Sequence, residues 1–150
     1  MMLTQKESTL LRDLKGQEQI CTQKYTRYAD MCCDPQLKTL FSTLASHERK
    51  HYDTLTQMES GTAPSMQGGV TPLPAEFTAS ACAAEQKAQD EYLCKDALSM
   101  EKFVSADYNT GIFEFRDKAM RDALNHIQGE EQEHGKALYD YMAANNMYCA

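Results

Sequence analysis

The chain has 150 residues, of which 42% are hydrophobic and 25% charged, and its formal net charge is −7. This length and apolar content suffice to bury one core without disulfide staples, so a single domain is expected. The lysines and arginines form no basic stripe, which argues against nucleic-acid binding. No apolar run approaches the roughly 18 residues of a membrane span, and no export signal is visible, which favours a cytoplasmic protein without a membrane anchor.

The first half of the chain predicts two long helices. Thr4, with a glutamate three residues later, is the capping-box start of a helix at about 5–32. Asp34 stands before a proline, and an N-cap acid followed by proline at the first helical position starts a second helix at about 35–59.

The second half predicts another pair of helices. Residues 61–74 hold three of the four prolines and three of the seven glycines, which is loop composition. A third helical pattern begins near Ser80, and Asp117 can cap a fourth helix that runs to about Asn145. The domain 1–150 is therefore divided into a helix hairpin at 4–59, a crossover at 60–80 and a second hairpin at 81–146.

The long connection determines the expected topology. A helix of 24 residues is about 36 Å long, and a connection of about 20 residues can span that length when it is extended. Helices two and three can therefore run parallel. The predicted fold is all-α, an antiparallel four-helix bundle with up-down-down-up topology and one long crossover between helices two and three.

An internal duplication supports this arrangement. When the second half is aligned on the first at an offset of 83 residues, eight of 67 positions agree. The identical pairs include a mid-helix glutamate, a tyrosine two turns later, a capping aspartate and a Glu-x-x-His motif. They are Leu10/Leu93, Asp13/Asp96, Glu18/Glu101, Tyr25/Tyr108, Asp34/Asp117, Glu48/Glu131, His51/His134 and Leu55/Leu138.

Polar residues interrupt the apolar face of each predicted helix. On the second helix, Glu48 and His51 fall within a stripe that is otherwise Leu, Phe and Met at spacings of three and four residues. Glu131 and His134 repeat this interruption on the fourth helix. The first and third helices carry one inward glutamate each, which are Glu18 and Glu101.

Four carboxylates and two imidazoles would thus face one interior. A buried carboxylate without a partner is penalised by several kcal/mol, so cations must lie among them. Two divalent cations balance four carboxylates when the histidines are neutral. One Glu from each of two helices, with Glu-x-x-His from each of the other two, is the pattern of di-iron and di-manganese carboxylate bundles. The predicted metal ligands are Glu18, Glu48, His51, Glu101, Glu131 and His134.

Two tyrosines lie on the same faces as these ligands. Tyr25 and Tyr108 each follow an inward glutamate by seven residues. Either side chain could hydrogen-bond a ligand or relay an electron in catalysis, and core packing explains both positions equally well.

Other chemically notable residues receive simpler interpretations. His47 and His126 are off the ligand positions and are interpreted as surface or hydrogen-bonded histidines. The charges at Glu130, Glu133 and Lys136 are interpreted as a solvated helix face. The methionines and cysteines are interpreted as core filler in a reducing compartment.

The four helices and their Glu…Glu-x-x-His…Glu…Glu-x-x-His set resemble the ferritin-like superfamily. Residues 14–19 with 33–38, and 108–117 with 123–127, further resemble the coat F family of spore coat proteins. By the first resemblance, one metal would be held by Glu18, Glu48 and His51, and the other by Glu101, Glu131 and His134. Glu48 and Glu131 would be the bridges.

The first functional hypothesis is a di-iron oxidoreductase that reacts with O2 or hydrogen peroxide, as an oxidase, peroxidase or ferroxidase. Carboxylate-rich ligands with one imidazole per metal suit two iron ions, with manganese as the alternative. The chain has no Cys-x-x-Cys motif, so turnover would need an external electron donor. Because the fourth helix takes the chain almost to Ala150, no iron-storage cage is expected.

The second hypothesis is a structural spore coat protein in which the metals only stabilise the bundle. Its location would be the spore coat, and its partners other coat proteins or a second copy in a homodimer. The third hypothesis is a metal buffer.

Overall fold

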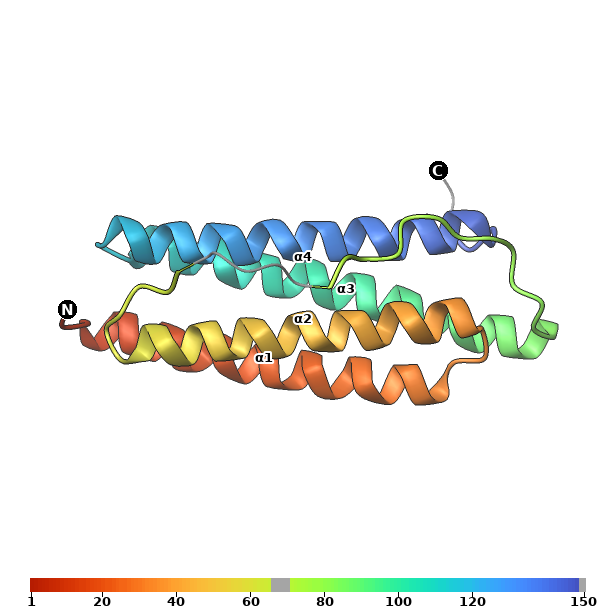
Figure 1. The fold of residues 1–150 in the computed structure, drawn as a ribbon, viewed down its shortest axis with the longest axis horizontal. Helices are drawn as coiled ribbons and strands as arrows, with labels where there is room; N and C mark the ends of the chain where they lie inside the picture. The colour runs from red at the N-terminus through yellow and green to blue at the C-terminus, as the bar shows by residue number, and fades with distance from the viewer. Residues whose placement is uncertain (66–70, 149–150) are drawn as a thin grey trace.

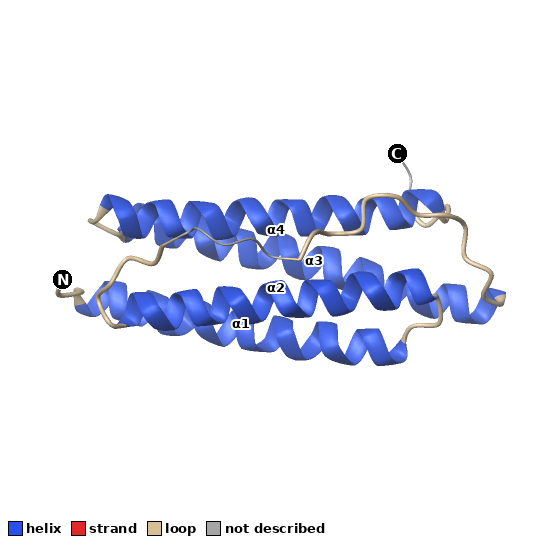
Figure 2. Ribbon diagram, viewed as in Figure 1, coloured by secondary structure: helices blue, strands red, loops and turns tan. Residues whose placement is uncertain are grey.

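The computed structural model describes residues 1–65 and 71–148. Its four helices lie side by side (Figure 1), and the rest of the described chain is loop (Figure 2). The predicted all-α four-helix bundle is confirmed. The helices are α1 (Gln5–Met31), α2 (Pro35–Glu59), α3 (Ala84–Glu114) and α4 (Lys118–Ala144).

Three of the helices begin at the caps that the sequence indicates. The Thr4 hydroxyl accepts the backbone N–H of Glu7 at 3.0 Å, and the Glu7 carboxylate accepts that of Thr4 at 2.7 Å. Asp34 accepts the N–H of Gln36 at 2.9 Å. Asp117 accepts an N–H of the first turn of α4 at 3.0 Å. These side chains satisfy backbone donors that a helix start leaves without partners.

The third helix begins later than the sequence pattern suggests. The backbone N–H of Ser80 is bonded to the Asn145 side chain at 2.7 Å, and the Ser80 hydroxyl accepts the N–H of Cys82 at 3.1 Å. A serine that bonds the backbone two residues ahead favours a turn over a helix. Helix α3 therefore starts at Ala84 instead of near residue 80.

The helix directions follow from the long crossover. In Figure 1, α1 and α2 form an antiparallel hairpin, and the connection to α3, described at residues 60–65 and 71–83, begins at one end of the bundle and ends at the other. Helix α3 consequently runs parallel to α2, and α4 returns antiparallel to α3. Helix α1 also packs against α3, and α2 against α4.

Two buried acids join the hairpins to each other at opposite ends of the bundle. The Asp90 carboxylate, on α3, accepts the backbone N–H groups of Cys33 and Asp34 at 2.9 and 3.1 Å. The Glu7 carboxylate, on α1, accepts the backbone N–H of Arg116 at 3.1 Å. Glu7 corresponds to Asp90, and Cys33 to Arg116, at the offset of 83 residues. The first helix of each hairpin thus holds the interhelical loop of the other.

The apolar core consists of two clusters with a polar layer between them. On α2, Leu44 belongs to one cluster and Leu55 to the other. On α4, Leu138 and Ile127 are divided in the same way. Both Glu-x-x-His motifs lie between these leucine and isoleucine positions, so the polar residues occupy the middle of the bundle.

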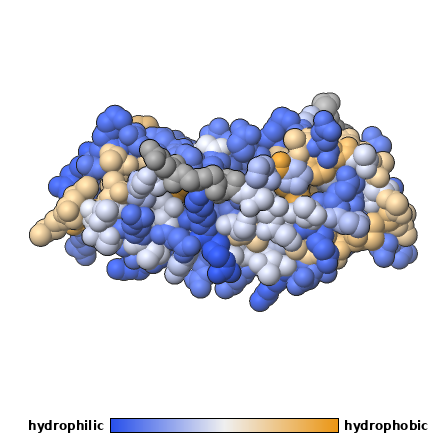
Figure 3. All heavy atoms as spheres, in the orientation of Figure 1, coloured by the Kyte–Doolittle hydropathy of each residue, from blue (hydrophilic) through white to orange (hydrophobic). Residues whose placement is uncertain are grey.

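The surface over this polar layer is also hydrophilic. Figure 3 shows mostly hydrophilic or neutral residues over the middle of the visible face, with apolar residues gathered toward the two ends. Among the described residues, no helix is both long enough and apolar enough to cross a membrane.

The interpretation of all cysteines as reduced core filler is wrong for one pair. Cys33, in the α1–α2 loop, forms a disulfide with Cys82, which lies just before α3. Cys21, Cys32 and Cys94 are free and buried, as core filler would be. The sixth cysteine lies outside the described residues. The disulfide ties the crossover to the same loop that Asp90 holds.

We predict that the disulfide stabilises the bundle by up to about 4 kcal/mol, because it closes a loop with a sequence separation of 49 residues in the unfolded chain. Dithiothreitol should lower the melting temperature of the wild type, measured by circular dichroism. The Cys33→Ser/Cys82→Ser double variant should melt at the lower temperature with or without the reductant. A wild type whose melting is indifferent to reductant would contradict this.

Candidate metal centre

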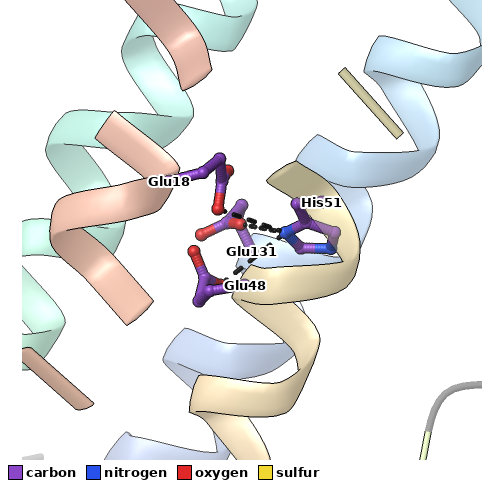
Figure 4. A group of neighbouring side chains, drawn as sticks. All are labelled: Glu18, Glu48, His51 and Glu131. Atoms are coloured by element: carbon purple, nitrogen blue, oxygen red, sulfur yellow. Dashed lines mark ion pairs between the residues drawn. The ribbon is translucent and has the colours of Figure 1, made fainter. Parts of the chain in front are cut away.

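Buried carboxylates and imidazoles meet in the middle of the bundle, and Figure 4 shows four of them converging. They form two groups, and within each group one possible ligand atom per residue lies within 4.8 Å of all the others. Every member is at most 3% exposed. The groups are Glu18, Glu48, His51 and Glu131, and Glu48, Glu101, Glu131 and His134.

Both imidazoles turn the same nitrogen toward the carboxylates. His51 Nδ1 lies 2.8 Å from Glu131 Oε1, and His134 Nδ1 lies 2.8 Å from Glu48 Oε1. The histidine of each Glu-x-x-His motif thus meets the glutamate of the other motif. Glu48 and Glu131 belong to both groups, as bridging residues would. The structure therefore brings together all six predicted ligands, and their coordination of metal stays a prediction.

Six carboxylate oxygens of this cluster are buried without a hydrogen-bond partner among the described residues. They are Glu18 Oε2, Glu101 Oε2 and both oxygens of Glu48 and Glu131. Such oxygens normally bind a donor or a cation, because burying them alone is costly. Ligand atoms of one divalent ion lie about 2.0 to 2.6 Å from it and so within about 5 Å of each other. The donor set and its spacing fit such ions.

In the metal-free protein, protons on the buried glutamates and histidines reduce the negative charge that a cation would otherwise balance. Burial, and then repulsion from Glu18 and Glu101, raises the pKa of Glu48 well above its ordinary value. Burial and the neighbouring glutamates likewise raise the pKa of Glu131. Burial opposes a charge on His51, but a hydrogen bond to Glu130 and the close carboxylates of Glu131 and Glu18 raise its pKa well above 6.5.

The second imidazole is paired with a charged carboxylate. Burial opposes a charge on His134, but the Glu101 carboxylate raises the pKa of this imidazole. Burial also disfavours ionised Glu101, and the His134 charge outweighs it and lowers the pKa of Glu101. Each of these protons would have to leave before the same atoms could bind a metal.

The two predicted tyrosines contact the cluster in a crossed arrangement. Tyr25, on α1, donates its hydroxyl to Glu101 Oε1 at 2.5 Å, and Tyr108, on α3, donates to Glu18 Oε1 at 2.5 Å. Burial, first, and the nearby carboxylates raise the pKa of both phenols, so both remain donors. Each hydroxyl occupies one oxygen of a glutamate and leaves the other for a cation. Both rings are also part of the apolar core.

His47 orients His134 from outside the cluster. It is buried and lies with Nδ1 2.9 Å from His134 Nε2, while its own Nε2 lies 2.6 Å from the Thr71 carbonyl oxygen. A carbonyl only accepts, so His47 carries its proton on Nε2 and accepts from His134 Nε2–H. Once the Nδ1 proton has left, this arrangement directs the Nδ1 lone pair of His134 at the carboxylates. His47 is therefore a hydrogen-bonded histidine, one of the two interpretations of its position.

Glu130 holds the other imidazole, so its assignment to a solvated face is wrong. Its Oε1 lies 3.3 Å from His51 Nε2 and 2.9 Å from the exposed His126 ring. The offset of 83 residues relates Glu130 to His47, and each stands directly before the glutamate of a Glu-x-x-His motif. This shared position was the available sequence signal. The neighbouring Glu133 is exposed, as predicted.

Comparison with known protein families gives a match to the segment that carries the α3–α4 residues of the cluster. Residues 89–150 match the Coat F domain family. The matched segment holds most of α3 and all of α4, with Glu101, Tyr108, Glu131 and His134. No curated protein and no solved structure matches the chain.

We predict that the metal-free protein loses stability as the pH rises. Folding raises the pKa of Glu48 and Glu131 above 4.5 and that of His51 above 6.5, so the folded state holds protons that the unfolded chain has released. The stability they contribute is complete below the ordinary values and is lost above them. With a chelator present, the melting temperature should therefore fall as the pH is raised from 4.5 through 6.5 and above. Saturating Mn(II) should remove this fall. A chelated protein that becomes steadily more stable over the same range would contradict it.

We also predict that Glu130→Gln weakens divalent-ion binding by about 10- to 100-fold, the usual effect of losing a group that orients a ligand histidine. Isothermal titration with Co(II) measures this affinity. Glu133→Gln removes an exposed carboxylate from the same helix and should bind as the wild type does. Equal affinities for the two variants would show that Glu130 does not support His51.

Proposed function

We propose that this protein is a metal-binding spore coat protein whose bundle core holds two divalent ions. The observation that carries the proposal is the set of six buried carboxylate oxygens that have no hydrogen-bond partner among the described residues. Four carboxylates bring a charge of −4 into the interior, and two divalent ions neutralise it. The sharing of Glu48 and Glu131 between the two groups favours a pair of ions over one.

The proposed location follows from the Coat F match, because the name of that domain indicates a coat component. The two ions would join residues from all four helices at mid-length. The Cys33–Cys82 disulfide and the Asp90 carboxylate already hold one end of the bundle. A protein held together in both places would resist unfolding, which suits a durable surface layer.

The donor chemistry favours iron or manganese. Carboxylate oxygens outnumber imidazoles in both groups, and hard oxygen donors suit these ions better than copper or structural zinc. In this proposal Glu18 and His51 bind one ion, Glu101 and His134 bind the other, and Glu48 and Glu131 bridge them. Tyr25 and Tyr108 hold the outer glutamates in place. When bound, such ions would supply one-electron redox chemistry.

A second candidate function is the reaction of a ferritin-like di-iron centre with O2 or peroxide. One observation favours it: a surface pocket between α3 and α4 is lined by Glu101 and Glu131. Metals that serve only as a staple need no such opening. Electrons would come from an external donor, and O2 or peroxide would be the oxidant.

We predict that Glu48→Ala/Glu131→Ala abolishes stoichiometric metal binding, because both shared ligands are lost. Elemental analysis after anaerobic loading with Fe(II) should find about two ions per wild-type chain and none per variant chain. Glu85→Ala/Glu133→Ala removes two exposed carboxylates and should keep both ions.

A Glu48→Ala/Glu131→Ala variant that bound as much metal as the wild type would contradict the ligand assignment. The redox candidate is then tested by mixing the Fe(II)-loaded wild type with O2, and separately with peroxide, in a stopped-flow spectrophotometer. Visible absorption that forms with either oxidant supports redox chemistry. Two retained ions without any change in absorption support the structural role alone.

A further inference from the structure

The two hairpins of the duplicated fold differ in how far they close over the candidate centre. Between α3 and α4, a pocket of about 370 Å³ has Glu101 and Glu131 in its wall. The Glu101 side chain is 3% exposed, whereas the side chains of Glu18, Glu48 and Glu131 are fully buried. The pocket on the α3–α4 side therefore extends from the surface to the edge of the cluster at Glu101 and Glu131.

The equivalent place between α1 and α2 contains an aromatic ring. Tyr52 corresponds to Gly135 of the α3–α4 pocket, and Lys15 corresponds to Leu98. The Lys15 ammonium lies over the Tyr52 ring, 4.9 Å from its centroid, and pairs with Glu59 at 3.2 Å. A pocket of about 250 Å³ beside Tyr52 has neither Glu18 nor Glu48 in its described wall.

Gly135 is the residue that leaves the α3–α4 side open. It lies inside α4, where a glycine costs about 1 kcal/mol relative to alanine. A Cβ at this position would come within 3.5 Å of Leu98 Cδ1, across the pocket. A larger side chain here would therefore occupy the pocket, as Tyr52 occupies the equivalent space on the other hairpin.

A third opening does not lead to the carboxylates. A pocket of about 360 Å³ beneath the crossover is lined by His47, Thr71, Glu130 and His134. His134 presents Nε2 to His47 and Nδ1 to the cluster, so its ring stands between His47 and the carboxylates. Of these three pockets, only the one beside Gly135 has a predicted carboxylate ligand in its wall.

We propose that the Gly135 pocket is the entrance through which small ligands of the metal pair, of the size of O2, peroxide or azide, reach the centre. This inference rests on the proposed metal binding. The exposed Lys102 lies in the pocket wall beside Glu101 and offers a positive charge to an entering anion. Among the described residues, Glu101 Oε2 and both oxygens of Glu131 are the carboxylate atoms on this side that have no hydrogen-bond partner.

Azide titration of the Co(II)-loaded protein tests the entrance, with the visible absorption of the bound Co(II) as the readout. The wild type should show an azide-dependent change. Gly135→Tyr should weaken or slow it at least tenfold, and Ser105→Leu, which fills the same pocket from α3, should act in the same direction. Gly129→Tyr is the matched control, because a Cβ at Gly129 meets nothing within 4 Å; it should behave as the wild type.

Cobalt content and circular dichroism are measured for each variant before azide is added. If Gly135→Tyr does not fold or hold two cobalt ions, Ser105→Leu decides. If a pocket-filling variant holds two cobalt ions and binds azide as the wild type does, the proposal that this pocket is the entrance is wrong. A wild type that holds two cobalt ions and shows no response to azide also overturns it, while leaving metal binding intact. A wild type that binds no cobalt overturns the proposed function itself.

Discussion

The burial of four carboxylates at the centre of one bundle is the constraint on which the rest of the structure depends. Their mutual repulsion acts at mid-length, where the helices would otherwise hold apolar residues. The metal-free protein reduces it by raising the pKa of Glu48 and Glu131 and by charging His51. At the ends of the bundle, the Asp90 and Glu7 hydrogen bonds and the disulfide join the two hairpins and oppose this repulsion. Cations at the centre would neutralise the four carboxylates and so remove their repulsion.

The duplicated hairpins are coupled because each completes the site of the other. The Tyr25 hydroxyl bonds the glutamate of α3, and the imidazole of each Glu-x-x-His motif meets the glutamate of the other motif. Neither hairpin alone contains a complete group of ligands. The halves diverge just outside this shared set. A histidine at position 47 corresponds to a glutamate at 130, and a tyrosine at 52 to a glycine at 135. Divergence at these positions would make the two proposed metal positions chemically different while the predicted ligands stay equivalent.

Features that depend on local sequence were predictable, and those that depend on contacts across the bundle were not. Helix starts such as Asp34 follow from side chains within a few residues, and the inward position of Glu48 follows from helical periodicity. The bond between Cys33 and Cys82 depends on where the crossover brings residue 82, which no local pattern encodes. His47 becomes buried because the crossover places the Thr71 carbonyl beside its ring. The opening at Gly135 depends on its pairing with Leu98 on another helix.

The structural and redox roles require different things of the same residues. A metal staple is most stable when its ligands are closed to water, because competing water and chelators then cannot reach the ions. The α1–α2 side meets that requirement with Tyr52 and Lys15. The α3–α4 side instead has a pocket at Glu101 and Glu131, although a side chain at position 135 would fill it and would remove the cost of a glycine within α4. A purely structural metal site does not need a pocket beside its bridging carboxylates. The presence of this pocket favours a chemical role for the centre over a stabilising role alone.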